Sequence, residues 1–263
     1  MQSKLLRSLL LFFGASILMQ VYYLVNTWLD LWSEYFPWGY IIHIVFYISI
    51  FAITIFFVGK PDLDYLGIKF VNLWRRYILM GLIFVLFHYA VRILVTEGTF
   101  NRIYPIRPEI YVPAFIFLGL LVGLSEESAF RGYIQKNILE AVKDAGVKES
   151  YKPTIAILMS SLLFGVYHVY FVGSGNAYWW ALYILQAFTA GIFMGFLYFE
   201  TGCNLLGPIT YHSTNVIVGN TIPWMATSSP YYQLTIATII NVVQTLILIG
   251  FSKIPKSIQR KCL

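Results

Sequence analysis

The chain has 263 residues, of which 59% are hydrophobic and only 11% are charged, and its mean hydropathy is +0.70. Soluble globular proteins carry about 25% charged residues, so this composition excludes that class and indicates an integral membrane protein. A formal net charge of +6 could suggest a nucleic-acid partner, but the basic residues cluster in short segments between apolar runs, which favours an explanation by membrane topology and no nucleic acid.

Eight apolar segments are long enough to cross a bilayer, which takes roughly 17 to 25 residues. They are residues 5–25, 38–58, 77–95, 111 to about 133, 154–172, 179–199, 205–222 and 234–251. The runs are long and show no ten-residue alternation, so we expect an all-α bundle of about eight transmembrane helices and not a β-barrel. The first segment is too long for a signal-peptide core and is expected to be retained. We expect one membrane domain over residues 1–263.

The distribution of Lys and Arg predicts the orientation. With a cytoplasmic N-terminus, fifteen basic residues fall in cytoplasmic segments and two fall outside, which predicts that both termini are cytoplasmic. The cytoplasmic set is Lys4, Arg7, Lys60, Lys69, Arg75, Arg76, Arg131, Lys136, Lys143, Lys148, Lys152, Lys253, Lys256, Arg260 and Lys261, and the outer set is Arg102 and Arg107. Residues 135–151 are expected to continue the fourth helix into the cytoplasmic interface and to turn near Gly146. Residues 101–113, with three prolines, are expected to form an extracytoplasmic loop.

Two adjacent acids, Glu126 and Glu127, stand at the end of the apolar fourth segment, in the sequence L-S-E-E-S-A-F-R-G. An acidic residue at bilayer depth costs about 2.5 to 3.5 kcal/mol, so a pair is expected to have a function. On a helix, Glu127 and Arg131 lie at positions i and i+4 and can form an ion pair. Glu126 is rotated away by about 100° and has no partner within the motif, which leaves it available for chemistry.

Two further polar groups interrupt apolar segments: F-G-V-Y-H, which ends at His168, and H-S-T-N, which runs from His212 to Asn215. A carboxylate, two imidazoles and an amide are the groups needed to activate water against a carbonyl carbon. The carboxylate can accept a proton from water, and imidazole and amide groups can donate hydrogen bonds to the developing oxyanion. The other two histidines, His43 and His88, are interpreted as helix–helix hydrogen-bonding residues, and His88 can form a small polar cluster with Arg92.

The order and spacing of these groups resemble the CPBP family, which comprises CAAX prenyl proteases, bacteriocin-processing enzymes and ABI-domain proteins. The resemblance rests on E-E-x-x-F-R-G, on F-x-x-x-H and on the later His and Asn, and it covers residues 111–219. It implies that Glu126 activates water with the help of His168, and that His212 and Asn215 form the oxyanion site. Glu127 and Arg131 would hold the geometry. Many members carry the Asn four residues after the His, whereas here Asn215 follows His212 by three and Val216 occupies the fourth position.

Alternatives remain at several residues. Glu127 and Arg131 can instead form a purely structural ion pair. Glu126, His168 and His212 can also supply three ligands of a catalytic zinc site with a fourth position open to water, although no H-E-x-x-H occurs. We favour the metal-free mechanism. Serine-protease chemistry is disfavoured, since no Asp lies in a span and no G-x-S-x-G occurs.

The sequence therefore predicts an intramembrane endopeptidase that opens toward the cytoplasmic leaflet and cleaves near the terminus of a membrane-associated substrate, either lipidated or a small peptide precursor. The alternative is a non-proteolytic ABI-domain protein for bacteriocin self-immunity or partner binding. A transporter is disfavoured because the two halves show no repeated pair of broken helices. At 1.5 Å per residue from the predicted span ends, Glu126 lies about 8 Å and His168 about 21 Å from the inner boundary of a 30 Å core, so these two residues are expected at different depths.

Overall fold

The computed structural model describes residues 2–28, 38–59, 63–70, 73–96, 98–100, 108–169, 176–221, 224–226 and 230–251. The helices are α1 (Gln2–Trp28), α2 (Trp38–Val58), α3 (Leu63–Leu66), α4 (Trp74–Thr96), α5 (Pro108–Glu127), the π-helix η1 (Ser128–Gln135), α6 (Lys136–Asp144), α7 (Lys152–Tyr167), α8 (Ala177–Glu200), α9 (Leu206–Thr221) and α10 (Pro230–Phe251). The strands β1 (Gly98–Phe100) and β2 (Trp224–Ala226) form one short antiparallel pair, with Thr99 opposite Met225. The all-α fold class predicted from the sequence is confirmed.

Each of the eight predicted membrane segments lies on its own helix: α1, α2, α4, α5 with η1, α7, α8, α9 and α10. Among the described residues, five helices are long and apolar enough to span a bilayer, namely α1, α2, α4, α8 and α10. Helix α7 is apolar but shorter, with 16 residues. The chain is therefore an integral membrane protein.

The boundaries differ from the sequence prediction in two places. Helix α5 begins at Pro108, so the last six residues of the loop predicted over residues 101–113 are helical instead. Proline is tolerated in the first turn of a helix, where its missing N–H has no intrahelical partner. The predicted ends at Val172 and Ile222 lie outside the described residues, as do Arg102, Arg107, Lys60 and the four C-terminal basic residues.

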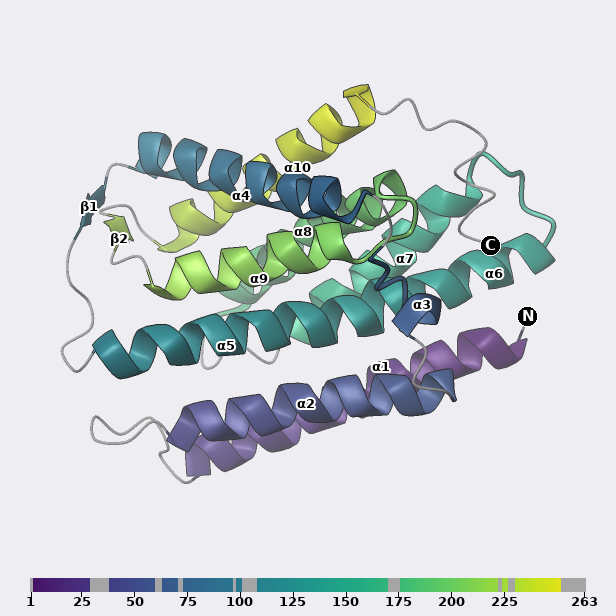
Figure 1. The fold of residues 1–263 in the computed structure, drawn as a ribbon, viewed down its shortest axis with the longest axis horizontal. Helices are drawn as coiled ribbons and strands as arrows, with labels where there is room; N and C mark the ends of the chain where they lie inside the picture. Colours follow the sequence, from purple (N-terminus) through teal and green to yellow (C-terminus); the bar gives the residue numbers. More distant parts are fainter. Residues whose placement is uncertain are drawn as a thin grey trace.

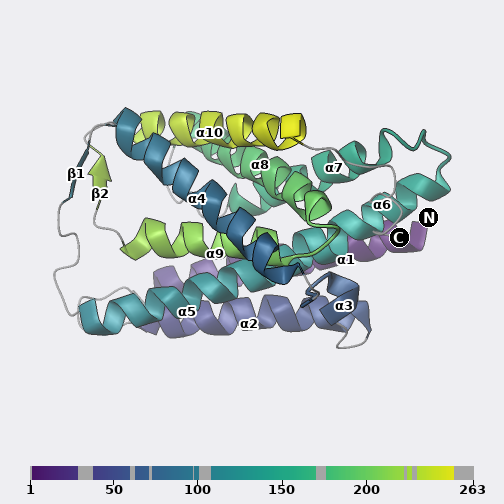
Figure 2. The same cartoon turned by 45° about the horizontal axis from the view of Figure 1, so that its top comes forward.

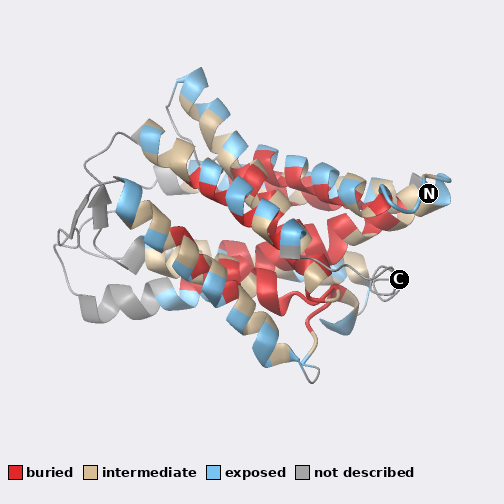
Figure 3. Ribbon diagram, turned by 90° about the horizontal axis from the view of Figure 1, so that it is seen from above, coloured by how far each residue is buried: buried red, intermediate tan, exposed pale blue. Residues whose placement is uncertain are grey.

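The helices pack side by side in layers (Figures 1 and 2). Helices α1 and α2 contact each other along one edge of the bundle, and α4 and α10 lie at the opposite edge. Between them, α5 contacts both α2 and α9, and α8 contacts both α7 and α10. The buried residues concentrate in the middle of the bundle, where α5, η1, α7, α8 and α9 meet (Figure 3).

Three glycines bring the central helices into close contact. On α5, an added Cβ at Gly119 would lie 2.5 Å from Cγ1 of Ile217, and one at Gly123 would lie 2.1 Å from Oγ of Ser213, both on α9. On α8, a Cβ at Gly191 would lie 3.0 Å from Cβ of Ser161 on α7. Small residues four apart are a common way for membrane helices to approach closely, because helix association in lipid depends on van der Waals packing. Glycine is therefore required where α5 meets α9.

The helix that carries the acidic pair changes its winding directly after that pair. Helix α5 ends at Glu127, the π-helix η1 covers the next eight residues, and α6 continues to Asp144 before a turn in which Gly146 adopts a φ of +70°. The predicted continuation of the fourth helix and its turn near Gly146 are confirmed. The π-helical winding was not predicted. Stretches of π-helix in proteins are rare and occur frequently at functional sites.

Candidate active site

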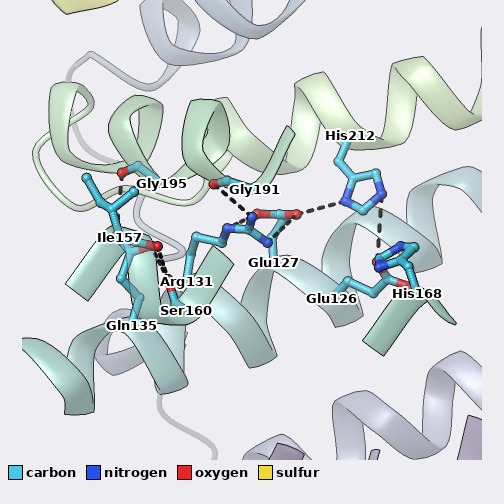
Figure 4. Close-up of polar contacts among 10 residues, drawn as sticks. All are labelled: Glu126, Glu127, Arg131, Gln135, Ile157, Ser160, His168, Gly191, Gly195 and His212. Atoms are coloured by element: carbon cyan, nitrogen blue, oxygen red, sulfur yellow. Dashed lines mark hydrogen bonds and ion pairs between the residues drawn. The ribbon is translucent and has the colours of Figure 1, made fainter. Parts of the chain in front are cut away.

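Glu126 lies in the centre of the bundle between two histidines from different helices (Figure 4). Its side chain is 1% exposed, and its Oε2 atom lies 3.7 Å from Nε2 of His168 and 3.8 Å from Nε2 of His212. Within the described part of the chain, this oxygen has no hydrogen-bond partner. Both separations exceed a direct hydrogen bond, so the carboxylate and the two rings are close neighbours that are not hydrogen-bonded to one another.

Glu127 is fully buried and contacts groups on two sides. Its Oε2 lies 3.3 Å from Nε of Arg131, and its Oε1 accepts hydrogen bonds from Arg131 Nη1 at 3.3 Å and from Nδ1 of His212 at 2.8 Å. The predicted i, i+4 ion pair is confirmed. The contact with His212 was not predicted, since that residue lies 85 positions away. Glu127 therefore fixes the ring of His212 so that its Nε2 faces Glu126.

Arg131 is fully buried, although the sequence analysis counted it among the cytoplasmic basic residues. Besides its ion pair, it donates a hydrogen bond from Nη2 to the backbone oxygen of Gly191 at 3.1 Å, and its guanidinium lies 4.3 Å from the ring centre of Phe164. A buried charge is stable only when it is paired and hydrogen-bonded, and all three contacts serve that need. Its charge belongs to the site and not to the membrane surface.

His168 is oriented by its own helix. Its Nδ1 donates to the backbone oxygen of Phe164 at 2.8 Å, since a carbonyl oxygen can only accept, and its Nε2 is then the lone-pair nitrogen that faces Glu126. The ring also packs on Phe164, with centroids 4.3 Å apart. Phe164 thus contacts both His168 and Arg131, which explains the aromatic residue four positions before the histidine.

The difference in depth predicted for Glu126 and His168 was wrong, because the two side chains approach to 3.7 Å. Helix α7 packs antiparallel to η1, and Ser160 donates to Oε1 of Gln135 at 3.0 Å. Glu126 lies nine residues before Gln135, and His168 lies eight residues after Ser160, so the antiparallel register brings them together. The count took residue 111 as the outer end of the fourth helix and residue 154 as the inner end of the fifth, whereas the fourth helix begins at Pro108, continues to Asp144 and is flanked over this length by α7.

A cavity of about 400 Å³ lies against Glu126. It is lined by residues of α2, α5, α7, α8 and α9, namely His43, Tyr47, Leu118, Val122, Glu126, Phe164, His168, Tyr183, Gln186, Ala187, Ala190, Met194, Tyr211, His212, Asn215 and Val216. On α5 the lining residues precede Glu126, and on α9 Asn215 and Val216 follow His212, so along both helices the cavity extends toward the end of the bundle that carries β1 and β2. The opposite end of the bundle carries Lys4, Lys136, Lys143, Lys148 and Lys152, and we call it the lysine-rich end. These lining residues do not test the predicted opening toward the cytoplasmic leaflet, which stays a prediction.

Asn215 also lines the cavity, one turn beyond His212 on α9, as its spacing of three residues predicts. The structure thus brings all of the predicted polar residues to one place, with Glu127 and Arg131 behind the cavity wall and the other four lining it.

Three lining residues were missed or interpreted only as structural. His43 packs against Tyr22 with ring centroids 4.4 Å apart and also lines the cavity, and the buried Tyr47 lies one turn further along α2. Tyr183 comes from α8. A tyrosine in an apolar segment is common at membrane interfaces, so only the repeat of polar residues four apart, His43 and Tyr47, could have indicated a face of α2 directed at the site.

The zinc alternative has no support from the geometry. Among the described residues, no group of three or more His, Cys, Asp and Glu side chains is arranged to hold a metal ion. We therefore derive no step through a metal.

Residues 108–218 match the family described as type II CAAX prenyl endopeptidase Rce1-like. The match spans α5 to α9, which carry every polar residue of the site discussed above except those on α2, and it confirms the resemblance drawn from the motifs. No curated protein matches the chain in sequence.

Proposed function

We propose that the protein is an intramembrane endopeptidase that cleaves a peptide bond near the terminus of a membrane-associated substrate, either a CAAX-type lipidated protein or a small peptide precursor. The observation that carries the proposal is the buried oxygen of Glu126 facing one nitrogen of each of two histidines. The match to the Rce1-like family supports the same class of reaction.

In this mechanism a water molecule in the cavity contacts both Glu126 and His168. Glu126 takes one proton from the water while the oxygen forms a bond to the carbonyl carbon of the substrate, which gives a tetrahedral oxyanion. His168, whose Nδ1 is held by the backbone, accepts a hydrogen bond from the water through Nε2 and orients it. Glu126 then returns the proton to the departing amide nitrogen, and the carbon–nitrogen bond breaks.

The oxyanion is stabilised from the α9 side. The buried Glu127 accepts a hydrogen bond from Nδ1 of His212 and stabilises positive charge on that ring, so that Nε2 can donate to the oxyanion. Asn215 supplies a second donor from the same cavity wall. Arg131 balances the charge of Glu127 and fixes its position. This division of roles would explain why two adjacent acids have such different surroundings.

The test uses full-length protein in liposomes with an S-prenylated peptide whose cysteine is followed by three residues, and with a peptide precursor carrying an N-terminal leader. Mass spectrometry of the products gives the cut position. We expect one of the two to be cleaved, and Glu126→Gln to lower the rate by about 10³-fold, because the removal of a positioned general base costs about 10² to 10⁴. Normal cleavage by Glu126→Gln, or an inactive wild type, would refute the proposal. If the Glu126→Gln protein instead retains a cellular protective function, the protein acts by binding, as the non-proteolytic alternative requires.

A further inference from the structure

Glu126, His168 and His212 are held in place by different means. His168 is oriented by the backbone oxygen of Phe164, and His212 is oriented by the carboxylate of Glu127. Both of these contacts lie within the residues that match the family. Glu126 approaches the two rings to 3.7 and 3.8 Å but is hydrogen-bonded to neither of them. The orientation of its carboxylate therefore depends on another group.

Tyr47 of α2 supplies that group. Its side chain forms a hydrogen bond with the carboxylate of Glu126, and the hydroxyl is the donor because an ionised carboxylate can only accept. Tyr47 is 4% exposed and lines the same cavity as Glu126 and the two histidines. A hydroxyl that donates to a carboxylate also offsets part of the cost of burying that charge among apolar helices. Tyr47 thus reaches the acid from the wall of the cavity.

Helix α2 is held against the helix that carries the acids. It packs along both α5 and η1. Further along α2, the backbone oxygen of Phe57 accepts a hydrogen bond from the hydroxyl of Tyr133 on η1 at 3.2 Å. The ring of Tyr47 stacks with that of His43, one turn earlier, with centroids 6.1 Å apart. These contacts restrict both the position of α2 and the ring of Tyr47, so the hydroxyl is fixed beside Glu126.

Helix α2 lies outside the part of the chain that matches the family. The match covers residues 108–218, whereas α2 covers Trp38–Val58 and packs with α1 along one edge of the bundle (Figure 2). The matched residues carry the acids, the histidines and Asn215, and the donor to Glu126 comes from elsewhere in the chain. An element from outside the matched segment therefore completes the surroundings of its central carboxylate.

We propose that Tyr47 is a positioning residue of the active site, whose hydroxyl holds the carboxylate of Glu126 in the orientation that faces both histidines. This inference rests on the proposed function and adds a residue of α2 to it. Tyr47 acts through Glu126, since it fixes the base that takes the proton from water. Without the hydroxyl, the carboxylate can turn away from the histidines and is less often in position to react.

Tyr47→Phe tests the proposal in kinetics, because it removes one oxygen atom and adds none. The assay uses full-length protein in liposomes and the peptide that the wild type cleaves. We expect kcat to fall about 10- to 100-fold, the usual effect of losing a hydrogen bond to a charged group, while KM changes by less than about twofold. The matched control is Tyr22→Phe, which alters a buried tyrosine of α1 and should leave both constants unchanged.

A double-variant comparison separates positioning from a general structural effect. Adding Tyr47→Phe to Glu126→Gln should cause no further loss of the residual rate, because the base that Tyr47 orients is already absent. A residue that only stabilises the fold would lower the rate by the same factor in both backgrounds.

Infrared spectroscopy tests the contact without turnover. The carboxyl band of Glu126 is isolated as the difference between each protein and the same protein with Glu126→Gln, in liposomes. The band should shift in Tyr47→Phe, because its hydrogen bond is lost, and should keep its wild-type position in Tyr22→Phe.

The proposal is overturned if the band keeps its position in Tyr47→Phe, whether or not the protein is active. It is also overturned if folded Tyr47→Phe keeps the wild-type kcat, if KM rises at constant kcat, or if the loss is equal in the two backgrounds. If the wild type cleaves neither peptide while the band shifts in Tyr47→Phe alone, the endopeptidase is refuted and the role of Tyr47 in orienting Glu126 stands.

Discussion

The two sides of Glu126 differ in how their polar groups are arranged. Toward the lysine-rich end, η1, α7 and α8 enclose what we call the packed seam. In it, Arg131 and Gln135 donate to the backbone oxygens of Gly191 and Gly195, and Ser160 donates to Gln135 (Figure 4). Toward the β1–β2 end, polar side chains line the open cavity. The same helices build both regions. Polar residues in this bundle therefore stabilise the fold where they are paired with one another, and they can bind a ligand where they line a cavity. Changes in the seam should therefore lower stability, and changes at the cavity should lower turnover.

Arg131→Met should have the largest effect. It leaves the carboxylate of Glu127 buried without its cation, which costs about 3 to 5 kcal/mol of folding free energy. Thermal unfolding in detergent measures the loss, and Arg76→Met, an exposed arginine, should change stability by no more than about 0.5 kcal/mol. Adding Glu127→Gln to Arg131→Met should restore part of the stability but not the activity. Equal stability of the two arginine variants would mean that the seam does not depend on this pair.

His212→Gln should lower kcat by about 10²- to 10³-fold, the usual effect of removing one oxyanion donor. The KM and the unfolding temperature should change little, because the side chain borders the cavity and is 12% exposed. Steady-state kinetics in liposomes separate the two constants. A raised KM at constant kcat would assign His212 to substrate binding.

Gly123→Ala tests the contact that sets the distance between the acids and His212. The new methyl group would overlap Ser213 and force α5 away from α9, which should cost about 1 to 3 kcal/mol and lower the activity by about 10²-fold through misplacement of about 1 Å. Gly14→Ala on α1 is the matched control, since a Cβ there meets nothing within 4 Å. Full activity of Gly123→Ala would show that the site tolerates a wider helix spacing.

Ser160→Ala should have the smallest effect. It removes one hydrogen bond to Gln135 in the packed seam, which is worth about 1 kcal/mol, and should leave kcat unchanged. Denaturation and kinetics on the same preparation test both statements. A lowered kcat in folded Ser160→Ala protein would mean that residues of the packed seam also contribute to the active site.

Local patterns in the sequence predicted much of this architecture. The length of the apolar segments predicted the long helices, and the spacing of four residues predicted the ion pair between Glu127 and Arg131. The gathering of Glu126, His168 and His212 followed from the motifs and not from periodicity, because contacts between helices depend on the packing of side chains far apart in the chain.

Register and direction could not be predicted. The position of His168 relative to Glu126 depends on the register in which α7 packs against η1. The hydrogen bond between Ser160 and Gln135 identifies that register, but it is known only from the structure. The direction in which the cavity extends depends on which helix faces are covered by side chains of neighbouring helices. The spacing of Gly119 and Gly123 on α5 was the readable signal for close helix packing beside the acidic pair, but only the structure identifies α9 as the partner helix.

The π-helical winding of η1 makes the protein sensitive to chain length at this point. Glu126 precedes η1 and faces the cavity, whereas Gln135 ends it and faces the seam. Removing or inserting one residue within η1 would move every residue after it out of register with the acids. Substitutions should thus be tolerated here far better than single-residue insertions or deletions, and a deletion scan through residues 128–135 should disable the protein at every position.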